Sequence, residues 1–240
     1  MRWLIPALFF PVAAQAQDVS EFVEANILGI FYHELGHAVI DIEGVPIFGQ
    51  EEDAADVFSI FLIDAFFEEE TALSLAYDAA FGFWAEAEAS FGEEVAWWSV
   101  HGPDEQRFYN TVCIFYGADP DNREGFAQDM GLPDERADYC PDEFDQANAA
   151  WGSVLDEMTE RGAGSSISFA ASSPKAAQQI AAVLAPEVAA LNAGMRLSSP
   201  LKVAVEPCEE ANAFYDLDAR QITFCTEFLP HLRKLDEALQ

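Results

Sequence analysis

The sequence feature that most constrains the fold is a pair of histidines four residues apart inside a strongly helical segment. Apolar side chains recur at helical spacing over residues 19–42, and Pro46 lies just beyond as a stop. Within this segment His33, Glu34 and His37 form a His-Glu-x-x-His pattern. Because residues four apart lie on one face of a helix, both imidazoles can reach one metal ion from the same side.

Zinc is the cation that suits this pattern best. It accepts imidazole and carboxylate ligands in a tetrahedral site, and it lowers the pKa of a bound water to about 7. We therefore predict that His33 and His37 bind Zn2+, with one ion per chain. Glu34 lies on the adjacent shoulder of the helix, where it can take a proton from that water as the catalytic base.

A third ligand is expected from the next helix, which is predicted over residues 51–70. Glu52 and Asp56 are four residues apart and so lie on one face of this helix. If the two helices form an antiparallel hairpin, Glu52 lies opposite His37 and Asp56 lies opposite His33. We predict that Glu52 binds the metal, whereas Asp56 accepts the free ring N–H of His33 and fixes its tautomer.

Two other acids compete with Glu52 as the third ligand. Glu43 stands six residues after His37, where a metzincin has its third histidine. A metzincin also needs a glycine three residues after its second histidine, and Ile40 occupies that position here. Glu51 is followed four residues later by Ala55, which offers no partner for a histidine ring. We therefore favour Glu52 over both.

A catalytic metal site also needs a donor for the oxyanion that develops on the reacting carbonyl. His101, in a break that contains Gly and Pro, is the first candidate for this catalytic role. The alternative interpretation is a structural loop histidine packed near Trp97 and Trp98. Weaker candidates for the oxyanion donor are Arg107, Tyr109 and Tyr215.

The rest of the chain predicts a mainly α-helical fold with a small C-terminal β-sheet, of the α+β class. Further helices are predicted over residues 71–90, 104–116, 122–130, 143–161 and 174–192. Strands are predicted over residues 201–205, 211–215 and 221–224, with a hairpin turn between the last two. The predicted units are a signal peptide (1–16), a helical core (17–161), a Gly/Ser-rich loop (162–174) and a C-terminal helix with a β-hairpin that packs on the core (175–240).

The first sixteen residues have the three parts of a secretory signal peptide. Arg2 supplies a positive charge, residues 3–12 are mostly apolar, and residues 14–16 form a small-x-small cleavage site. The apolar stretch is too short to span a bilayer as a stable helix. We therefore expect a secreted or periplasmic protein whose mature chain begins at Gln17.

The chain has four cysteines, an even number that predicts two disulfides in an exported protein. Three pairings are possible, and the simplest joins Cys113 to Cys140 and Cys208 to Cys225. The second disulfide would hold the predicted C-terminal hairpin, whose exposed edge could align a substrate peptide. No cysteines form a Cys-x-x-Cys pair, which argues against a zinc site built from them.

The formal net charge of −32 limits the classes of partner. Nucleic acid is excluded as a partner because phosphate binding needs clustered Lys and Arg. An anionic membrane surface is disfavoured for the same reason, and no later segment is long and apolar enough to span a bilayer. We expect a peptide or protein substrate and no stable membrane association after signal removal.

Several segments together resemble the putative metallopeptidase family of secreted bacterial proteins. They are residues 31–40, 49–58, 101–113 with 116–120, and 212–225. The resemblance implies a zincin-like zinc peptidase, here of the gluzincin type. In better-known gluzincins such as thermolysin, the sheet precedes the His-Glu-x-x-His helix. Here the strands follow it, so a zincin-like fold would have a permuted order of sheet and helix.

Two other functions are compatible with the same residues. The chain could be an exported binding or structural protein that contains zinc and has no hydrolytic activity. A closed coordination sphere would distinguish that function, since catalytic zinc keeps an open position. A zinc hydrolase that acts on a non-peptide amide is the other alternative, and the sequence does not separate it from a peptidase.

Overall fold

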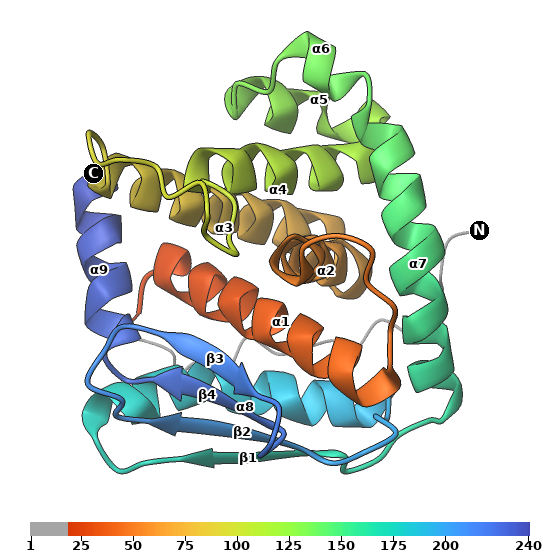
Figure 1. Cartoon of the computed structure of the whole chain (residues 1–240), viewed down its shortest axis with the longest axis vertical. Helices are drawn as coiled ribbons and strands as arrows, with labels where there is room; N and C mark the ends of the chain where they lie inside the picture. The colour runs from red at the N-terminus through yellow and green to blue at the C-terminus, as the bar shows by residue number, and fades with distance from the viewer. Residues whose placement is uncertain (1–18) are drawn as a thin grey trace.

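Long helices make up most of the chain, as the computed structural model of residues 19–240 shows (Figure 1). The predicted signal peptide, residues 1–16, lies outside the described residues. The helices are α1 (Glu21–Glu43), α2 (Glu51–Phe66), α3 (Glu69–Ala89), α4 (Asp104–Ala118), α5 (Pro120–Asp129), α6 (Asp134–Ala137), α7 (Cys140–Glu160), α8 (Lys175–Gly194) and α9 (Phe228–Leu239). The prediction of a mainly helical chain with a small C-terminal sheet is confirmed. Within residues 19–240 no helix has the length and apolar character that a membrane crossing requires.

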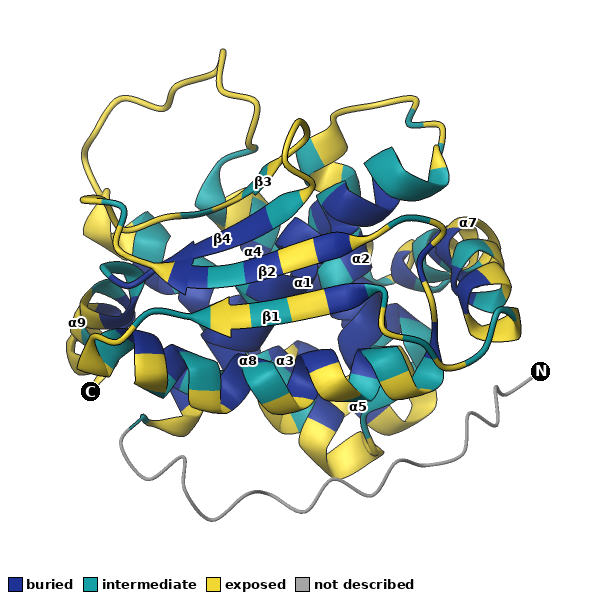
Figure 2. Cartoon of the chain, turned by 90° about the horizontal axis from the view of Figure 1, so that it is seen from below, coloured by how far each residue is buried: buried dark blue, intermediate teal, exposed yellow. Residues whose placement is uncertain are grey.

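The sheet contains β1 (Ile167–Ala171), β2 (Leu201–Glu206), β3 (Ala213–Asp216) and β4 (Gln221–Cys225), in the order β1-β2-β4-β3. The strand β2 is parallel to both β1 and β4, whereas β3 is antiparallel to β4. In β2 the buried residues Leu201, Val203 and Val205 alternate with more exposed ones, so one face of the sheet is packed and the other meets solvent (Figure 2).

Two helices cover the packed face of the sheet. The helix α1 contacts β3 and β4, and α8 contacts β1 and β2. The helices α1 and α8 also contact each other, so they lie on the same side of the sheet (Figure 1). This arrangement places the edge strand β3 beside the helix that carries the two histidines.

The C-terminal part contains two elements that the sequence patterns did not predict. The predicted loop over residues 162–174 contains β1, which pairs with β2 from Ile167 opposite Leu201 onward. Its Ser and Ala residues resemble a loop locally, and the strand forms because β2 supplies hydrogen-bonding partners. The helix α9 was also missed, although its buried residues Leu229, Leu232 and Leu235 have helical spacing.

The crossing of α1 and α2 brings the predicted site residues together. Figure 1 looks almost along the axis of α2, whereas α1 runs across the view. Gly36 allows the close approach, since a Cβ atom there would lie 3.1 Å from the Cα atom of Ala55. A second contact lies four residues after Ala55 on α2 and seven residues before Gly36 on α1. There the Ser59 hydroxyl donates a hydrogen bond to the Gly29 carbonyl at 2.7 Å. The order of the two contacts is reversed between the helices, as in the predicted hairpin, but α1 and α2 cross at a steep angle and do not lie side by side along their lengths (Figure 1).

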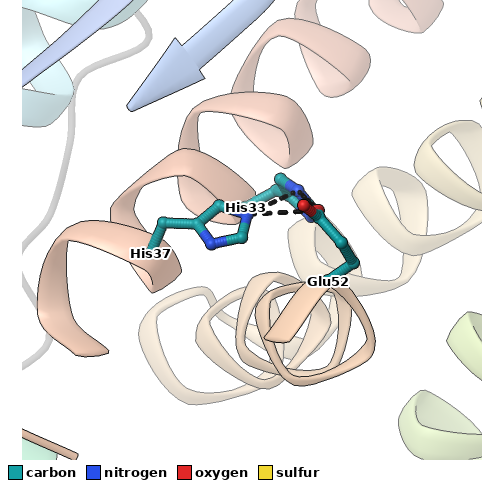
Figure 3. A group of neighbouring side chains, drawn as sticks. All are labelled: His33, His37 and Glu52. Carbon is teal, nitrogen blue, oxygen red and sulfur yellow. Dashed lines mark hydrogen bonds and ion pairs between the residues drawn. The ribbon is translucent and has the colours of Figure 1, made fainter. Parts of the chain in front are cut away.

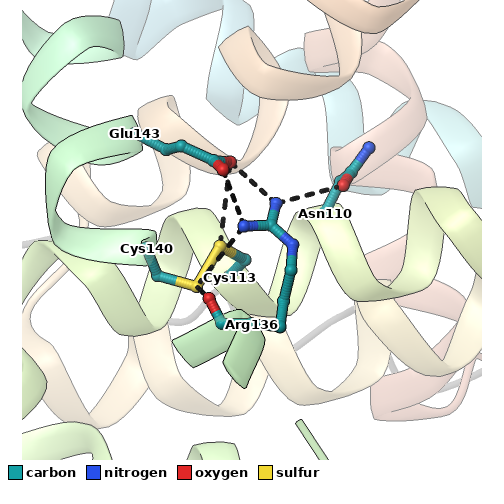
Figure 4. Close-up of a disulfide and its surroundings, with 5 residues drawn as sticks. All are labelled: Asn110, Cys113, Arg136, Cys140 and Glu143. Carbon is teal, nitrogen blue, oxygen red and sulfur yellow. Dashed lines mark hydrogen bonds and ion pairs between the residues drawn. A yellow bond between two sulfur atoms is a disulfide. The ribbon is translucent and has the colours of Figure 1, made fainter. Parts of the chain in front are cut away.

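Both disulfides of the local pairing are present. Cys113 of α4 is joined to Cys140 at the start of α7 (Figure 4). Beside this disulfide, the Arg136 guanidinium donates to both carboxylate oxygens of Glu143, each at 2.7 Å. The second disulfide joins Cys208, just after β2, to the end of β4 at Cys225.

Candidate metal centre

Three side chains from α1 and α2 converge on one point (Figure 3). The Nε2 atoms of His33 and His37 are 3.2 Å apart, and each lies 3.2 Å from the Oε2 atom of Glu52. A tetrahedral ion with ligand bonds of 2.0–2.1 Å has ligand atoms about 3.3 Å apart. The three atoms are therefore spaced as one face of a tetrahedral site that can hold a metal ion.

The outer ring nitrogen of His33 is fixed by a buried carboxylate. His33 Nδ1–H donates to Asp56 Oδ1 at 2.7 Å, and the same carboxylate accepts from Arg107 Nε at 2.7 Å and Nη2 at 2.9 Å. The side chains of His33 and Asp56 are each only 10% exposed. This chain of contacts holds the proton on Nδ1, so Nε2 is the ring nitrogen of His33 that can bind a metal ion.

The outer ring nitrogen of His37 is fixed by a different acid. His37 Nδ1–H donates to Glu51 Oε1 at 2.8 Å, and the Glu51 side chain is 49% exposed. The absence of an acid at position 55 led the sequence interpretation to set Glu51 aside. The signal is present in the three consecutive acids at the start of α2, because neighbouring positions point to different sides of a helix and can serve different partners.

The protonation of the ligands follows from these contacts. Burial opposes protonation of His33, but its hydrogen bonds with Asp56 and Glu52 outweigh that effect and raise its pKa to about 9. Hydrogen bonds from His101, His33 and His37 hold the pKa of Glu52 far below its ordinary value. Burial raises the pKa of Asp56, but hydrogen bonds from Arg107 and His33 outweigh burial and lower it to about 2. A bound cation would take the place of the protons between the ligand atoms.

Glu34 is a buried carboxylate beside the three ligands. Its residue is 7% exposed, and it lines the cleft that contains His33 and His37. Burial raises the pKa of Glu34 to about 7, although the nearby His33 and His37 oppose this shift. A cation bound next to it would lower that pKa, so Glu34 can accept a proton and release it again.

His101 joins the metal centre from the loop before α4. Its Nε2 atom lies 2.9 Å from Glu52 Oε2, and its side chain is 45% exposed. Its ring centroid is 6.2 Å from that of His33. Trp97 and Trp98 are largely exposed, and within residues 19–240 no ring contact joins them to His101.

The other sequence candidates lie around the site in different roles. The Arg107 guanidinium is engaged by Asp56, so it holds that carboxylate and is not directed at a substrate. Tyr215 lines the cleft, and its hydroxyl donates a hydrogen bond to Asp41 at 2.8 Å.

Tyr109 and Glu43 make contacts with other parts of the chain. Tyr109 packs its ring against Phe108. Glu43, the disfavoured ligand, accepts from Arg161 at 2.9 Å and from the Ser198 amide at 2.8 Å.

The site opens into a cleft of about 740 Å³. Besides the ligands, the cleft is lined by residues 98–101 and by residues 212–215, three of which belong to the edge strand β3. Trp98, Val100 and Leu217 expose apolar surface at this cleft. A chain segment bound there would lie between the metal position and an unpaired strand edge.

Comparison with protein-family models gives a match over most of the chain. A family model described as "Putative metallopeptidase" matches residues 8–155 and 171–240. The matched ranges contain His33, Glu34, His37 and Glu52, as well as all four cysteines. No curated protein and no solved structure matches the chain.

Proposed function

The chain belongs to the putative metallopeptidase family, and on that premise we propose that it hydrolyses peptide bonds with one zinc ion held by His33, His37 and Glu52. The observation that carries this proposal is the set of equal 3.2 Å spacings between the three ligand atoms. Two imidazole nitrogens and one carboxylate oxygen suit zinc, whereas Mg2+ and Ca2+ prefer oxygen ligands.

Glu34 is the proposed general base and acid. A zinc ion in this site would polarise the carbonyl of the scissile bond and make the attacking water more acidic. Glu34 accepts the proton from that water and delivers it to the leaving amine. Its burial keeps competing solvent away from the carboxylate.

His101 is the proposed donor for the developing oxyanion. Its ring stands at the open side of the site, where its contact with Glu52 holds it near the ligands. A half-exposed ring on a loop can turn from Glu52 toward the substrate carbonyl. His101 then completes the machinery without serving as a metal ligand.

The cleft supports a polypeptide as the substrate in preference to a small amide. The strand β3 lies at the edge of the sheet, and three of its residues line the same cleft as the ligands. An extended peptide can form main-chain hydrogen bonds along such an edge. The cleft volume of about 740 Å³ also fits several residues of a bound chain.

We also propose that the protein is secreted or periplasmic. Two disulfides link its helices and strands, and structural disulfides are typical of oxidising compartments. The predicted signal peptide over residues 1–16 provides the route of export. Amino-terminal sequencing of the exported protein tests this proposal, with Gln17 as the expected first residue.

Glu34→Gln tests the proposed function directly. We expect purified wild-type protein to hold close to one zinc per chain and to cleave peptides, with activity lost to a chelator and restored by zinc. Removing a general base lowers kcat by roughly two to four orders of magnitude. The variant should therefore lose turnover and retain its zinc, as measured by peptide cleavage and metal analysis.

Glu88→Gln is the matched control, because Glu88 is an exposed acid at the end of α3. It should leave both turnover and zinc content unchanged. Loss of zinc together with activity in Glu34→Gln would contradict the assigned role and mean that Glu34 is a ligand or a structural group.

A further inference from the structure

A second cavity lies behind the metal centre. It has a volume of about 190 Å³ and is smaller and more enclosed than the cleft. Both spaces are lined by His33, Glu34, His101, Asn212 and Ala213. They therefore meet where the proposed base and one ligand stand, and a group at the reacting bond can reach the inner cavity.

Apolar side chains from several helices form most of the inner wall. The large apolar residues are Ile30 of α1, Ile60 and Ile63 of α2, Phe83 of α3, and Phe228, Leu232 and Leu235 of α9, and Ala79 of α3 lies among them. Because α9 contributes three of these side chains, the pocket depends on the C-terminal helix as well as on the helices that carry the metal ligands.

The charged groups on this wall other than Glu34, the proposed base, are already paired with one another or with their neighbours. Arg107 is engaged by Asp56 at 2.7 Å, and Glu86 accepts from His231 Nε2 at 2.6 Å. The Ser59 hydroxyl donates to a main-chain carbonyl. An acidic side chain that entered the cavity would lose its hydration without a free cation among the lining residues to pair with. A basic side chain could pair only with Glu34, which the proposed reaction needs as its base. An apolar side chain would gain by leaving water.

The size of the cavity sets the size of the group that it can hold. An apolar cavity of about 150 Å³ lined by Leu, Ile and Phe binds benzene. The space here exists because small residues meet at the contact of α1 and α3: a Cβ atom on Gly29 would lie 3.6 Å from the Cβ atom of Ala79. A side chain as large as Leu, Met or Phe therefore fits.

We propose that the inner cavity binds the substrate side chain next to the scissile bond and makes the enzyme selective for a large apolar residue there. The inference rests on the proposed peptidase function and deepens it by naming the substrate class. A substrate side chain that adds one methylene in such a pocket gains roughly 10- to 200-fold in kcat/KM. The kcat/KM for peptides with Leu or Phe at this position should exceed the kcat/KM for their Ala counterparts by at least about tenfold.

Ala79→Leu tests the proposal by filling the cavity from α3. With zinc-loaded protein and a peptide series that varies one residue beside the cleaved bond, the variant should lose about tenfold in kcat/KM for Leu and Phe peptides. Ala and Gly peptides should change by less than about twofold, because their side chains do not need the space. The matched control is Ala89→Leu, the same change at an exposed position of the same helix, which should behave like wild type.

Binding of toluene to the metal-free protein gives a readout that is independent of catalysis. Wild type and Ala89→Leu should bind toluene in a ligand-detected NMR titration, and Ala79→Leu should not. Should Ala79→Leu fail to fold, Gly29→Ala is the milder variant, since its added methyl meets Ala79 at an ordinary contact distance of 3.6 Å. Gly29→Ala should weaken toluene binding and lower the ratio of kcat/KM for Leu and Phe peptides to kcat/KM for Ala peptides.

The role of the inner cavity and the proposed peptidase function are contradicted by different results. Cleavage that is indifferent to the side chain beside the bond overturns the inference alone, and so does a folded wild-type protein that does not bind toluene. A zinc-loaded protein that cleaves no peptide contradicts the proposed function itself, whether or not toluene binds.

Discussion

The two halves of the metal centre use nearly equal hydrogen bonds in very different surroundings. In the inner half, His33 donates to Asp56 at 2.7 Å, and both side chains are 10% exposed. In the outer half, His37 donates to Glu51 at 2.8 Å, and Glu51 is 49% exposed. Bond length alone would rank the two contacts as equivalent.

Burial separates the two halves energetically. Removing one partner of a buried charged pair leaves an uncompensated charge and costs about 3–5 kcal/mol. An exposed pair contributes about 0–1 kcal/mol, because water and salt compete for both partners. Arg107 also approaches Asp56 with two nitrogen atoms, whereas Glu51 has no comparable cation in the described contacts. The inner half is therefore expected to fix the geometry of the site, and the outer half to adjust to its occupant.

Asp56→Asn should have the largest effect, because it removes the charge on which the inner half depends. We expect the free energy of unfolding of the metal-free protein to fall by about 3 kcal/mol, as Arg107 loses its buried partner. Zinc affinity should fall roughly 10- to 100-fold, because His33 loses the acceptor that orients it. Urea denaturation and competitive zinc titration measure the two effects. A loss of stability below about 1 kcal/mol would place Asp56 in the same class as an exposed acid.

The same contact predicts a pH dependence of stability. The pKa of Asp56 is lowered from 3.8 to about 2 in the folded protein. Its stabilising contribution is therefore fully present above about pH 4 and is lost as the pH falls toward 2. Between these values the metal-free wild type should lose more unfolding free energy than Asp56→Asn does. Parallel curves for the two proteins in urea denaturation at each pH would contradict the assigned contact.

Gly36→Ala should disturb both halves at once, because it acts on the distance between α1 and α2. The added methyl would lie 3.1 Å from the Ala55 Cα atom, so one helix must move. We expect a loss of about 1–3 kcal/mol in unfolding free energy, together with weaker zinc binding. The matched control is Gly125→Ala in α5, where a Cβ atom meets nothing within 4 Å. That control should be neutral or slightly stabilising, and equal losses in both variants would exclude the close approach as the cause.

Glu51→Gln should have the smallest effect, because it alters the exposed contact of the outer half and leaves the buried contact of the inner half intact. Unfolding free energy should change by less than about 1 kcal/mol, and the change should shrink further in 1 M salt. The amide oxygen can still accept from His37, so zinc affinity should fall less than in Asp56→Asn. The two variants are best compared in one titration series. A Glu51→Gln loss as large as that of Asp56→Asn would mean that burial does not separate the two halves.

The sequence predicts those site residues that are linked by local spacing. His33, His37, Glu52 and Asp56 were predictable because four-residue spacings within two adjacent helices define a common face. Arg107 belongs to a helix 51 residues beyond Asp56, and no local spacing connects the two positions. Its role as the partner of Asp56 therefore became visible only in the folded chain.

The fold shows a similar limit. The longer helices with apolar spacing are predicted, whereas the short α9 is not. The five residues of β1, Ile-Ser-Phe-Ala-Ala, follow a Gly/Ser-rich stretch, and their strand conformation depends on pairing with β2, about 30 residues later. The inner cavity could not be predicted at all, because it arises where α1, α2, α3 and α9 leave space between them. No residue pattern within one helix encodes such a gap.

Anomalous X-ray scattering at the zinc absorption edge, from crystals of the zinc-loaded protein, tests the central claim most directly. The account predicts one strong peak about 2 Å from the Nε2 atoms of His33 and His37 and from the Glu52 carboxylate. A peak coordinated by Glu51 in place of Glu52 would contradict it, as would Glu52 turned away from the two histidines with no zinc between them.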